Sequence, residues 1–133
     1  MEILLKKRTN STTFEATNDT GNTILIDGLS DAAMSPMQIL LSSVAGCTVV
    51  DIQLILEKQR EPLEDIEIKI SGERVDSKVV KPFKSIHIHF VLKGALNEDK
   101  VSRAISLSVE KYCSVATSLD KNIDITYSHE IVA

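Results

Sequence analysis

The sequence lacks any surplus of basic residues. Its 133 residues include 15 Lys and Arg against 19 Asp and Glu, which gives a net charge of −4 with neutral histidines. Proteins that bind the phosphate backbone of DNA or RNA normally present a basic face. Nucleic-acid binding is therefore disfavoured.

No stretch approaches the ~20 apolar residues that cross a bilayer. At the N-terminus the apolar residues 3–5 precede the basic residues 6–8, which reverses the order found in a secretory signal. We therefore expect a cytoplasmic protein that does not associate with membranes.

Cysteine is also scarce. Cys47 and Cys113 are the only two, too far apart for a CxxC motif and too few for a zinc cage or a disulfide framework. The chain has no internal repeat, no Gly/Ser linker and no glycine-rich phosphate loop. With 43% hydrophobic and 26% charged residues, residues 1–133 are predicted to form a single soluble domain with its own core.

Alternating or β-branched segments predict six strands, and a meander of three opens the chain. The turn between the first two is placed at Asn10–Ser11. The predicted strands are Glu2–Lys7, Thr12–Thr17, Thr23–Asp27, Asp65–Arg74, Ser85–Lys93 and a last one around Ile123–Ser128.

A long helix is predicted from Ser35. Ser35 and Gln38 have the spacing of a capping box, and Pro36 suits the first helical position. The helix should end near Gln59, before Glu61-Pro62. Because its first half has little polar surface, we expect it to be the buried centre of the molecule.

A second helix is predicted from an Asn97 cap to Cys113, followed by a short helical turn over 114–120. The resulting order, β-β-β-α-β-β-α-α-β, is an α+β fold. His87 and His89 share one face of a strand at a spacing used in metal sites, but no third ligand is evident nearby, so a polar strand face is favoured over a metal site.

Cys47 lies about three turns into the long helix and is preceded by small residues. Gly46 costs about 1 kcal/mol in mid-helix relative to alanine, which indicates that a backbone or a ligand approaches there. Asp51, one turn on, disfavours a thiolate unless it also holds a cation. A buried, inert Cys47 is the alternative.

Cys113 lies where the second helical pattern falters. Ser114 could cap a new turn, so that Cys113 would face a helix N-terminus, which favours the thiolate.

Three segments, read together, resemble the OsmC/Ohr superfamily. They are Asp31–Met37 continuing through Ala45–Thr48, Gly72–Arg74, and Arg103–Ala104 leading into Glu110–Val115. The sequence is most similar to the OsmC-like branch whose second cysteine lies in a Lys-Tyr-Cys-Ser-Val run.

The resemblance implies an intertwined homodimer with active sites at the interface. It also implies thiol peroxidase activity toward organic hydroperoxides in oxidative-stress defence, with Cys47 as the peroxidatic cysteine and Cys113 as the resolving one. A thiolate would cleave the O–O bond, the sulfenic acid would condense with the second thiol, and an external thiol or dithiol would reduce the disulfide. This chemistry requires no metal, flavin or nucleotide.

The chain departs from the family pattern at two charges. Met37 stands where hydroperoxide-resistance members carry a glutamate, and Gln38 is explained as the capping-box partner. Those members also carry an arginine in the first β-hairpin, but here no arginine falls at the matching point near Asn10–Ser11, and Arg8 is the nearest. The candidate activating cations are Arg74 and Lys111, paired with Asp51 or Glu110; a solvated charge is the alternative for each.

Apolar residues near Cys47 are expected to line an access path or a dimer core and to favour apolar peroxides. These substrate-binding candidates are Met34, Met37, Leu40, Leu41, Val44 and, as a hydrogen-bond donor, Tyr112. Two other interpretations stay open: a non-catalytic or redox-sensing dimer that binds an apolar ligand, and structural cysteines in a fold that serves a partner protein.

Overall fold

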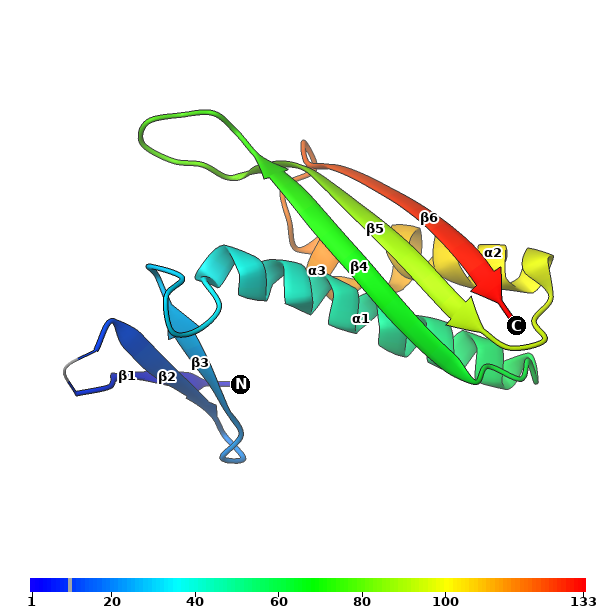
Figure 1. Cartoon of the computed structure of the whole chain (residues 1–133), viewed down its shortest axis with the longest axis horizontal. Coiled ribbons are helices and arrows are strands. Elements are labelled where there is room, and N and C mark those ends of the chain that lie inside the picture. Colours follow the sequence, from blue (N-terminus) through cyan, green and yellow to red (C-terminus); the bar gives the residue numbers. More distant parts are fainter. Residues whose placement is uncertain (10) are drawn as a thin grey trace. The chain divides into compact units, whose positions relative to one another are not determined.

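The computed structural model of the chain describes residues 1–9 and 11–133; Asn10, in the predicted first turn, lies outside the described residues. The chain divides into two compact units, Met1–Leu40 and Leu41–Ala133, and each is described by itself. The elements (Figure 1) are β1 (Ile3–Lys7), β2 (Thr13–Asn18), β3 (Thr23–Asp27), α1 (Pro36–Lys58), β4 (Asp65–Arg74), β5 (Phe83–Lys93), α2 (Glu98–Leu107), the π-helical segment η1 (Ser108–Tyr112), α3 (Ser114–Thr117) and β6 (Asp124–Val132).

Unit 1 is an antiparallel meander with strand order β1-β2-β3. The Asn18 side chain accepts hydrogen bonds from the backbone N–H groups of Thr20 and Asn22, at 3.1 and 2.9 Å, and so fixes the turn between β2 and β3. The predicted opening meander is confirmed, with β3 at the predicted bounds.

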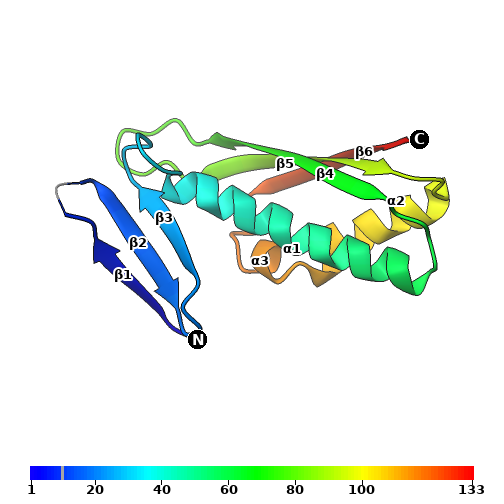
Figure 2. The same ribbon diagram turned by 60° about the horizontal axis from the view of Figure 1, so that its bottom comes forward.

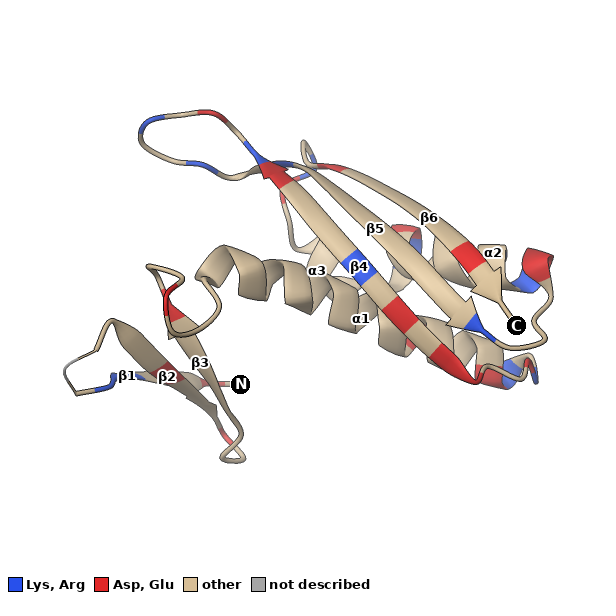
Figure 3. Ribbon diagram, viewed as in Figure 1, with Lys and Arg blue, Asp and Glu red and all other residues tan. Residues whose placement is uncertain are grey.

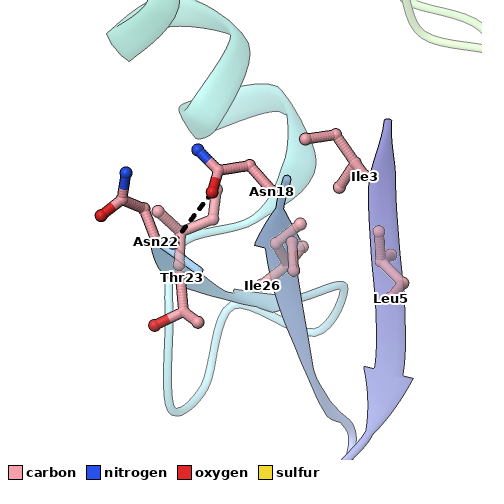
Figure 4. Close-up of a pocket in the computed structure, with 8 residues that line it drawn as sticks. Ile3, Leu5, Asn18, Asn22, Thr23 and Ile26 are labelled. Carbon is pink, nitrogen blue, oxygen red and sulfur yellow. Dashed lines mark hydrogen bonds between the residues drawn. The ribbon is translucent and has the colours of Figure 1, made fainter. Parts of the chain in front are cut away.

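One face of this sheet is apolar and uncovered. Ile3, Leu5 and Ile24 on this face are each more than half exposed. A shallow hollow of about 300 Å³ lies over the three strands on this side (Figure 4). A sheet that exposes its apolar face has no complete core of its own and needs a further surface to cover it.

The loop after β3 is organised by Asp27. This buried carboxylate accepts hydrogen bonds from Leu29 N, Ala32 N and Thr12 Oγ1, at 2.9, 3.1 and 3.0 Å. These bonds, led by those from Ala32 and Leu29, hold the pKa of Asp27 below its ordinary value. The stabilisation is therefore present above pH ~4 and is lost as acid protonates the carboxylate.

The predicted capping box then starts α1. Gln38 N donates to Ser35 Oγ at 3.2 Å, and Ser35 N donates to Gln38 Oε1 at 2.9 Å. At the other end of α1, Arg60 takes a positive φ of 58°. Glu61 N donates a hydrogen bond to Leu56 O, which closes the helix with a C-terminal cap.

The expectation that α1 is the buried centre of the molecule is met on one face of the helix and is wrong for the others. Only the row Val44, Thr48, Ile52 and Leu56 is buried, at the four-residue spacing of one helix face. Val50 and Leu54 are more than half exposed. By length and composition α1 could also cross a membrane, a criterion that the apolar core helix of an α+β domain meets as well.

Unit 2 is a mixed sheet covered by helices on one face. β5 is central, antiparallel to β4 and parallel to β6. Figure 2 shows α1, α2 and α3 on the same side of this sheet. The predicted alternation is confirmed, because β5 points its apolar side chains toward the helices; these are Ile86, Ile88, Phe90 and Leu92, all completely or almost completely buried.

The opposite face of the sheet is polar. His87 Nδ1 and Nε2 hydrogen-bond with Thr126 Oγ1 and Ser128 Oγ, at 2.7 and 3.0 Å, and His89 Nδ1 hydrogen-bonds with Ser128 Oγ at 2.7 Å. The residues alternate across β5 and β6, as predicted for a polar strand face.

Candidate functional site

The fold of unit 2 brings the two cysteines together. Cys47 lies on α1 and Cys113 lies between η1 and α3. The Cys47 side chain interacts with the Cys113 thiol closely enough to raise its pKa, and both cysteines are free. A disulfide between them requires Cα atoms about 4.4–6.8 Å apart.

The π-helical segment sets the position of Cys113. The Cys113 N–H donates to Ser108 O at 3.0 Å, five residues back, where an α-helix would use the fourth. Ser108 Oγ in turn donates to the Thr48 carbonyl oxygen at 3.0 Å in a fully buried contact. Thr48 directly follows Cys47, so one bond links the two cysteine-bearing segments.

The role of Ser108 was not found from the sequence. The only signal was the faltering of the three-to-four spacing before Cys113. A turn closed by a hydrogen bond over five residues shifts the apolar spacing by one position. This shift indicates an irregular helical segment, but it does not identify Ser108 as the residue with the buried hydroxyl.

The sequence predicts that a helix N-terminus favours the Cys113 thiolate, but in the structure burial outweighs this effect. Cys113 does cap α3, and its Sγ accepts a hydrogen bond from Ala116 N at 3.4 Å. Burial nevertheless raises the pKa of Cys113 to about 11, assisted by the side chain of Cys47. Cys113 therefore stays protonated at neutral pH and can donate its proton toward the Cys47 sulfur.

Cys47 is half-buried, whereas Cys113 is 1% exposed. Gly46 beside it is exposed, and a Cβ placed there would meet no atom of another element within 4 Å among the described residues. None of the described residues makes the close approach that this mid-helix glycine indicates.

Asp51 lies on the same helix, one turn after Cys47. Its Oδ2 is buried and, within residues 1–9 and 11–133, has no hydrogen-bond partner. Figure 3 shows that α1 carries no Lys or Arg in the stretch that surrounds Cys47. The cation predicted to accompany Asp51 is not supplied by the described part of this chain.

The two cation candidates in this unit are engaged elsewhere. Arg74 Nε donates to the Lys81 carbonyl oxygen at 2.6 Å, in the exposed loop between β4 and β5. Lys111 lies over the Tyr112 ring, 5.9 Å from its centroid. Glu110 accepts hydrogen bonds from Tyr127 Oη and Ser106 Oγ, both at 3.0 Å, so its carboxylate is oriented toward β6 and α2.

Known proteins resemble this chain in sequence and in fold. The family model described as OsmC-like protein matches residues 28–128. The chain belongs to the OsmC-like family. It is 42% identical to the protein YhfA of Escherichia coli K12 over 123 residues, which cover 91% of each chain. The predicted family is thereby confirmed.

Solved structures of other proteins share the fold. A hypothetical protein from Aquifex aeolicus is 30% identical over 99% of this chain and 97% of its own, with a TM-score of 0.83. The organic hydroperoxide resistance protein OhrB of Bacillus subtilis covers 98% of both chains with a TM-score of 0.64 at 17% identity. This more distant likeness concerns the fold alone.

The apolar candidates of this OsmC-like chain fall in both units. Met34, Met37 and Leu40 belong to unit 1, where Met34 is exposed. In unit 2, Leu41 lies against Gly72 on the sheet, 3.3 Å from the position of an added Cβ. Val44 is completely buried, which places it in the core, and Tyr112 is about half exposed.

A metal centre finds no support in the part of the chain that the structure describes. No group of three or more His, Cys, Asp or Glu side chains there could hold a metal ion. His129 Nε2 contacts Glu98 Oε1 at 2.6 Å, and the backbone N–H of Arg8 donates to Thr13 O within unit 1.

Proposed function

We propose that this OsmC-like protein reduces organic hydroperoxides with Cys47 as nucleophile and Cys113 as resolving thiol. The observation that carries the proposal is that two free thiols from distant parts of the sequence interact within one unit of the fold. Cys47 suits the first role because it is the more exposed. Cys113 suits the second because it is buried, protonated and influenced by Cys47.

The chemistry balances with these two groups. The Cys47 thiolate attacks one peroxide oxygen, the O–O bond breaks, and the alkoxide leaves as an alcohol after taking up a proton. The Cys47 sulfenic acid then condenses with the Cys113 thiol, which forms the disulfide and releases water. Two equivalents of an external thiol restore both cysteines by exchange.

The proposed substrates are apolar hydroperoxides. Peroxides with an aromatic or long alkyl group gain from burial against apolar side chains near Cys47, whereas hydrogen peroxide gains nothing. We expect cumene hydroperoxide to react at least about 10-fold faster than hydrogen peroxide. Stopped-flow measurement of thiol loss tests this, and equal rate constants would contradict the preference.

We further propose that residues 1–133 act as one domain within a homodimer in the cytoplasm. The family match runs from unit 1 into unit 2, which supports a single functional domain. The proposed covering surface is a second copy of the chain. It is supported by the uncovered sheet face of unit 1 and by the exposed side of α1 at Gly46 and Val50.

A Gly46→Leu variant should weaken this dimer. Gly46 leaves room for close approach, and a leucine there would obstruct a neighbouring backbone. We expect the dimer dissociation constant to rise at least about 10-fold. Sedimentation velocity over a range of concentrations measures it, with Asn122→Leu, an exposed position in the turn before β6, as the matched control. An unchanged dissociation constant would exclude α1 from the interface.

A redox-sensing role is the second candidate. It is favoured by Asp51, which places a carboxylate one turn from Cys47 without a partner cation in the described part of the chain. A sensor would form the disulfide once and turn over slowly. Sustained consumption of cumene hydroperoxide with a thiol reductant in excess supports the enzyme, and a single equivalent consumed supports the sensor.

A further inference from the structure

A cavity lies beside the two helical segments that carry the cysteines. It has a volume of about 320 Å³, and its lining comes from α1 and from the segment that leads from α2 to Cys113. Asp51 lies one turn beyond Cys47, and Tyr112 directly precedes Cys113, so the cavity borders both cysteine-bearing segments. Its lining residues are Asp51, Leu54, Ile55, Lys58, Leu107 and Tyr112.

Asp51 lines the cavity, and one of its carboxylate oxygens lacks a hydrogen-bond donor among the described residues. Asp51 Oδ2 is shielded from solvent and receives no hydrogen bond from the described residues. Lys58 lines the same cavity but lies seven residues on, about 10 Å along the helix axis, and forms no ion pair with Asp51 within residues 1–9 and 11–133. A carboxylate that lines a cavity without a partner cation favours a ligand that brings a positively charged N–H group.

The rest of the lining limits what this donor is attached to. Leu54, Ile55 and Leu107 offer apolar walls for a short carbon chain. The negative charge of Asp51 beside the sulfur repels a ligand that carries a carboxylate at the same place. Because Asp51 lies one helical turn from Cys47, the ammonium group has to lie only a few bonds from the group that reacts with the sulfur.

We propose that this cavity binds the ammonium end of a low-molecular-weight aminothiol, with nitrogen two carbon atoms from sulfur, which reduces the Cys47–Cys113 disulfide. The aminothiol thiolate attacks the Cys47 sulfur, the bond to Cys113 breaks, and Cys113 leaves and takes up a proton. A second aminothiol attacks the mixed disulfide, which releases Cys47 and an aminothiol disulfide. This inference rests on the proposed function in one respect, namely that a Cys47–Cys113 disulfide has to be reduced.

Three small thiols of equal chain length test the inference: cysteamine, 2-mercaptoethanol and 3-mercaptopropionate, which are cationic, neutral and anionic. The protein disulfide is formed with diamide, which takes one hydrogen from each thiol and becomes a hydrazine, so no peroxide is used. Each rate constant for reduction is divided by that of the same thiol with bis(2-hydroxyethyl) disulfide, which removes differences in intrinsic reactivity.

We expect the normalised rate constant for cysteamine to exceed that for 3-mercaptopropionate by about 10-fold or more, with 2-mercaptoethanol between them. Asp51→Asn, which keeps the shape of the side chain, should reduce this ratio to within about 2-fold of unity. Glu57→Gln removes the same charge from an exposed position of the same helix outside the cavity and should leave the ratio unchanged.

A ratio near unity in the natural protein would overturn the inference, as would a ratio that survives Asp51→Asn or that falls equally in Glu57→Gln. Failure of diamide to link the two cysteines would also overturn it. If cumene hydroperoxide does not form the disulfide but the diamide-made disulfide shows the ratio, the peroxidase proposal fails and this inference stands.

Discussion

A Cys47→Ser variant is expected to lose reduction of cumene hydroperoxide, with kcat/KM falling by at least about 10³-fold. A serine hydroxyl in the same place is a far weaker nucleophile than a thiolate. Cys113 cannot replace it, because this thiol is buried and its raised pKa of about 11 keeps it protonated. Peroxide consumption with a thiol reductant in excess measures the loss.

The Cys113→Ser variant provides the contrast. It keeps the nucleophile, so the first equivalent of peroxide should be consumed at close to the natural rate. Without a resolving thiol, the Cys47 sulfenic acid should then accumulate and oxidise further to the sulfinic acid. Retention of activity by Cys47→Ser, or a first turnover lost equally in both variants, would show that the two cysteines do not have these separate roles.

Replacement of Gly94 by alanine should produce the largest loss of stability among the glycines. Gly94 follows β5 with a φ of +141°, and an added Cβ would lie 2.5 Å from the Pro62 carbonyl oxygen. Backbone occupies that space, so no side chain can move aside. We expect the free energy of unfolding to fall by about 3 kcal/mol.

Urea unfolding followed by circular dichroism, at one protein concentration throughout, measures this change. Gly28→Ala is the matched control, because a Cβ at Gly28 meets nothing within 4 Å among the described residues and its φ lies outside the left-handed region. A control variant that loses as much stability as Gly94→Ala would show that the close approach to Pro62 is not the cause.

The order of elements could be predicted from the sequence because the local signals agree with one another. The capping box at Ser35 and Gln38, the Asn97 cap and the alternation along β5 all correspond to contacts in the structure. Strand β3 and strand β4 have the predicted bounds. These signals depend on neighbours within a few residues, which a sequence displays directly.

The burial of α1 could not be predicted in the same way. A helix that is apolar on all sides is normally buried on all sides, yet only the row through Val44 and Leu56 is buried here. Periodicity measures how apolar a face is and does not identify which molecule covers it. The exposed face of α1 and that of the first sheet are therefore the surfaces that the proposed second copy of the chain would cover.

The charges around the cysteines also depend on the fold. From the sequence, Arg74 is a candidate cation because it lies in the Gly72–Arg74 run of the family resemblance, and Lys111 because it lies beside the second cysteine, with Glu110 as a candidate ion-pair partner. In the structure Arg74 is held by the Lys81 carbonyl oxygen and Glu110 by Tyr127 and Ser106. Hydrogen bonds between segments decide these orientations, and spacing along the chain does not reveal them.

We propose that Cys47 and Cys113 of one chain react as a pair with an organic hydroperoxide. Mass spectrometry of peptides after addition of one equivalent of cumene hydroperoxide to the reduced protein tests it most directly. We predict a Cys47–Cys113 disulfide within one chain as the main product. Oxidation of Cys47 to a sulfinic acid with Cys113 left as a free thiol, or no reaction at either cysteine, would contradict the claim.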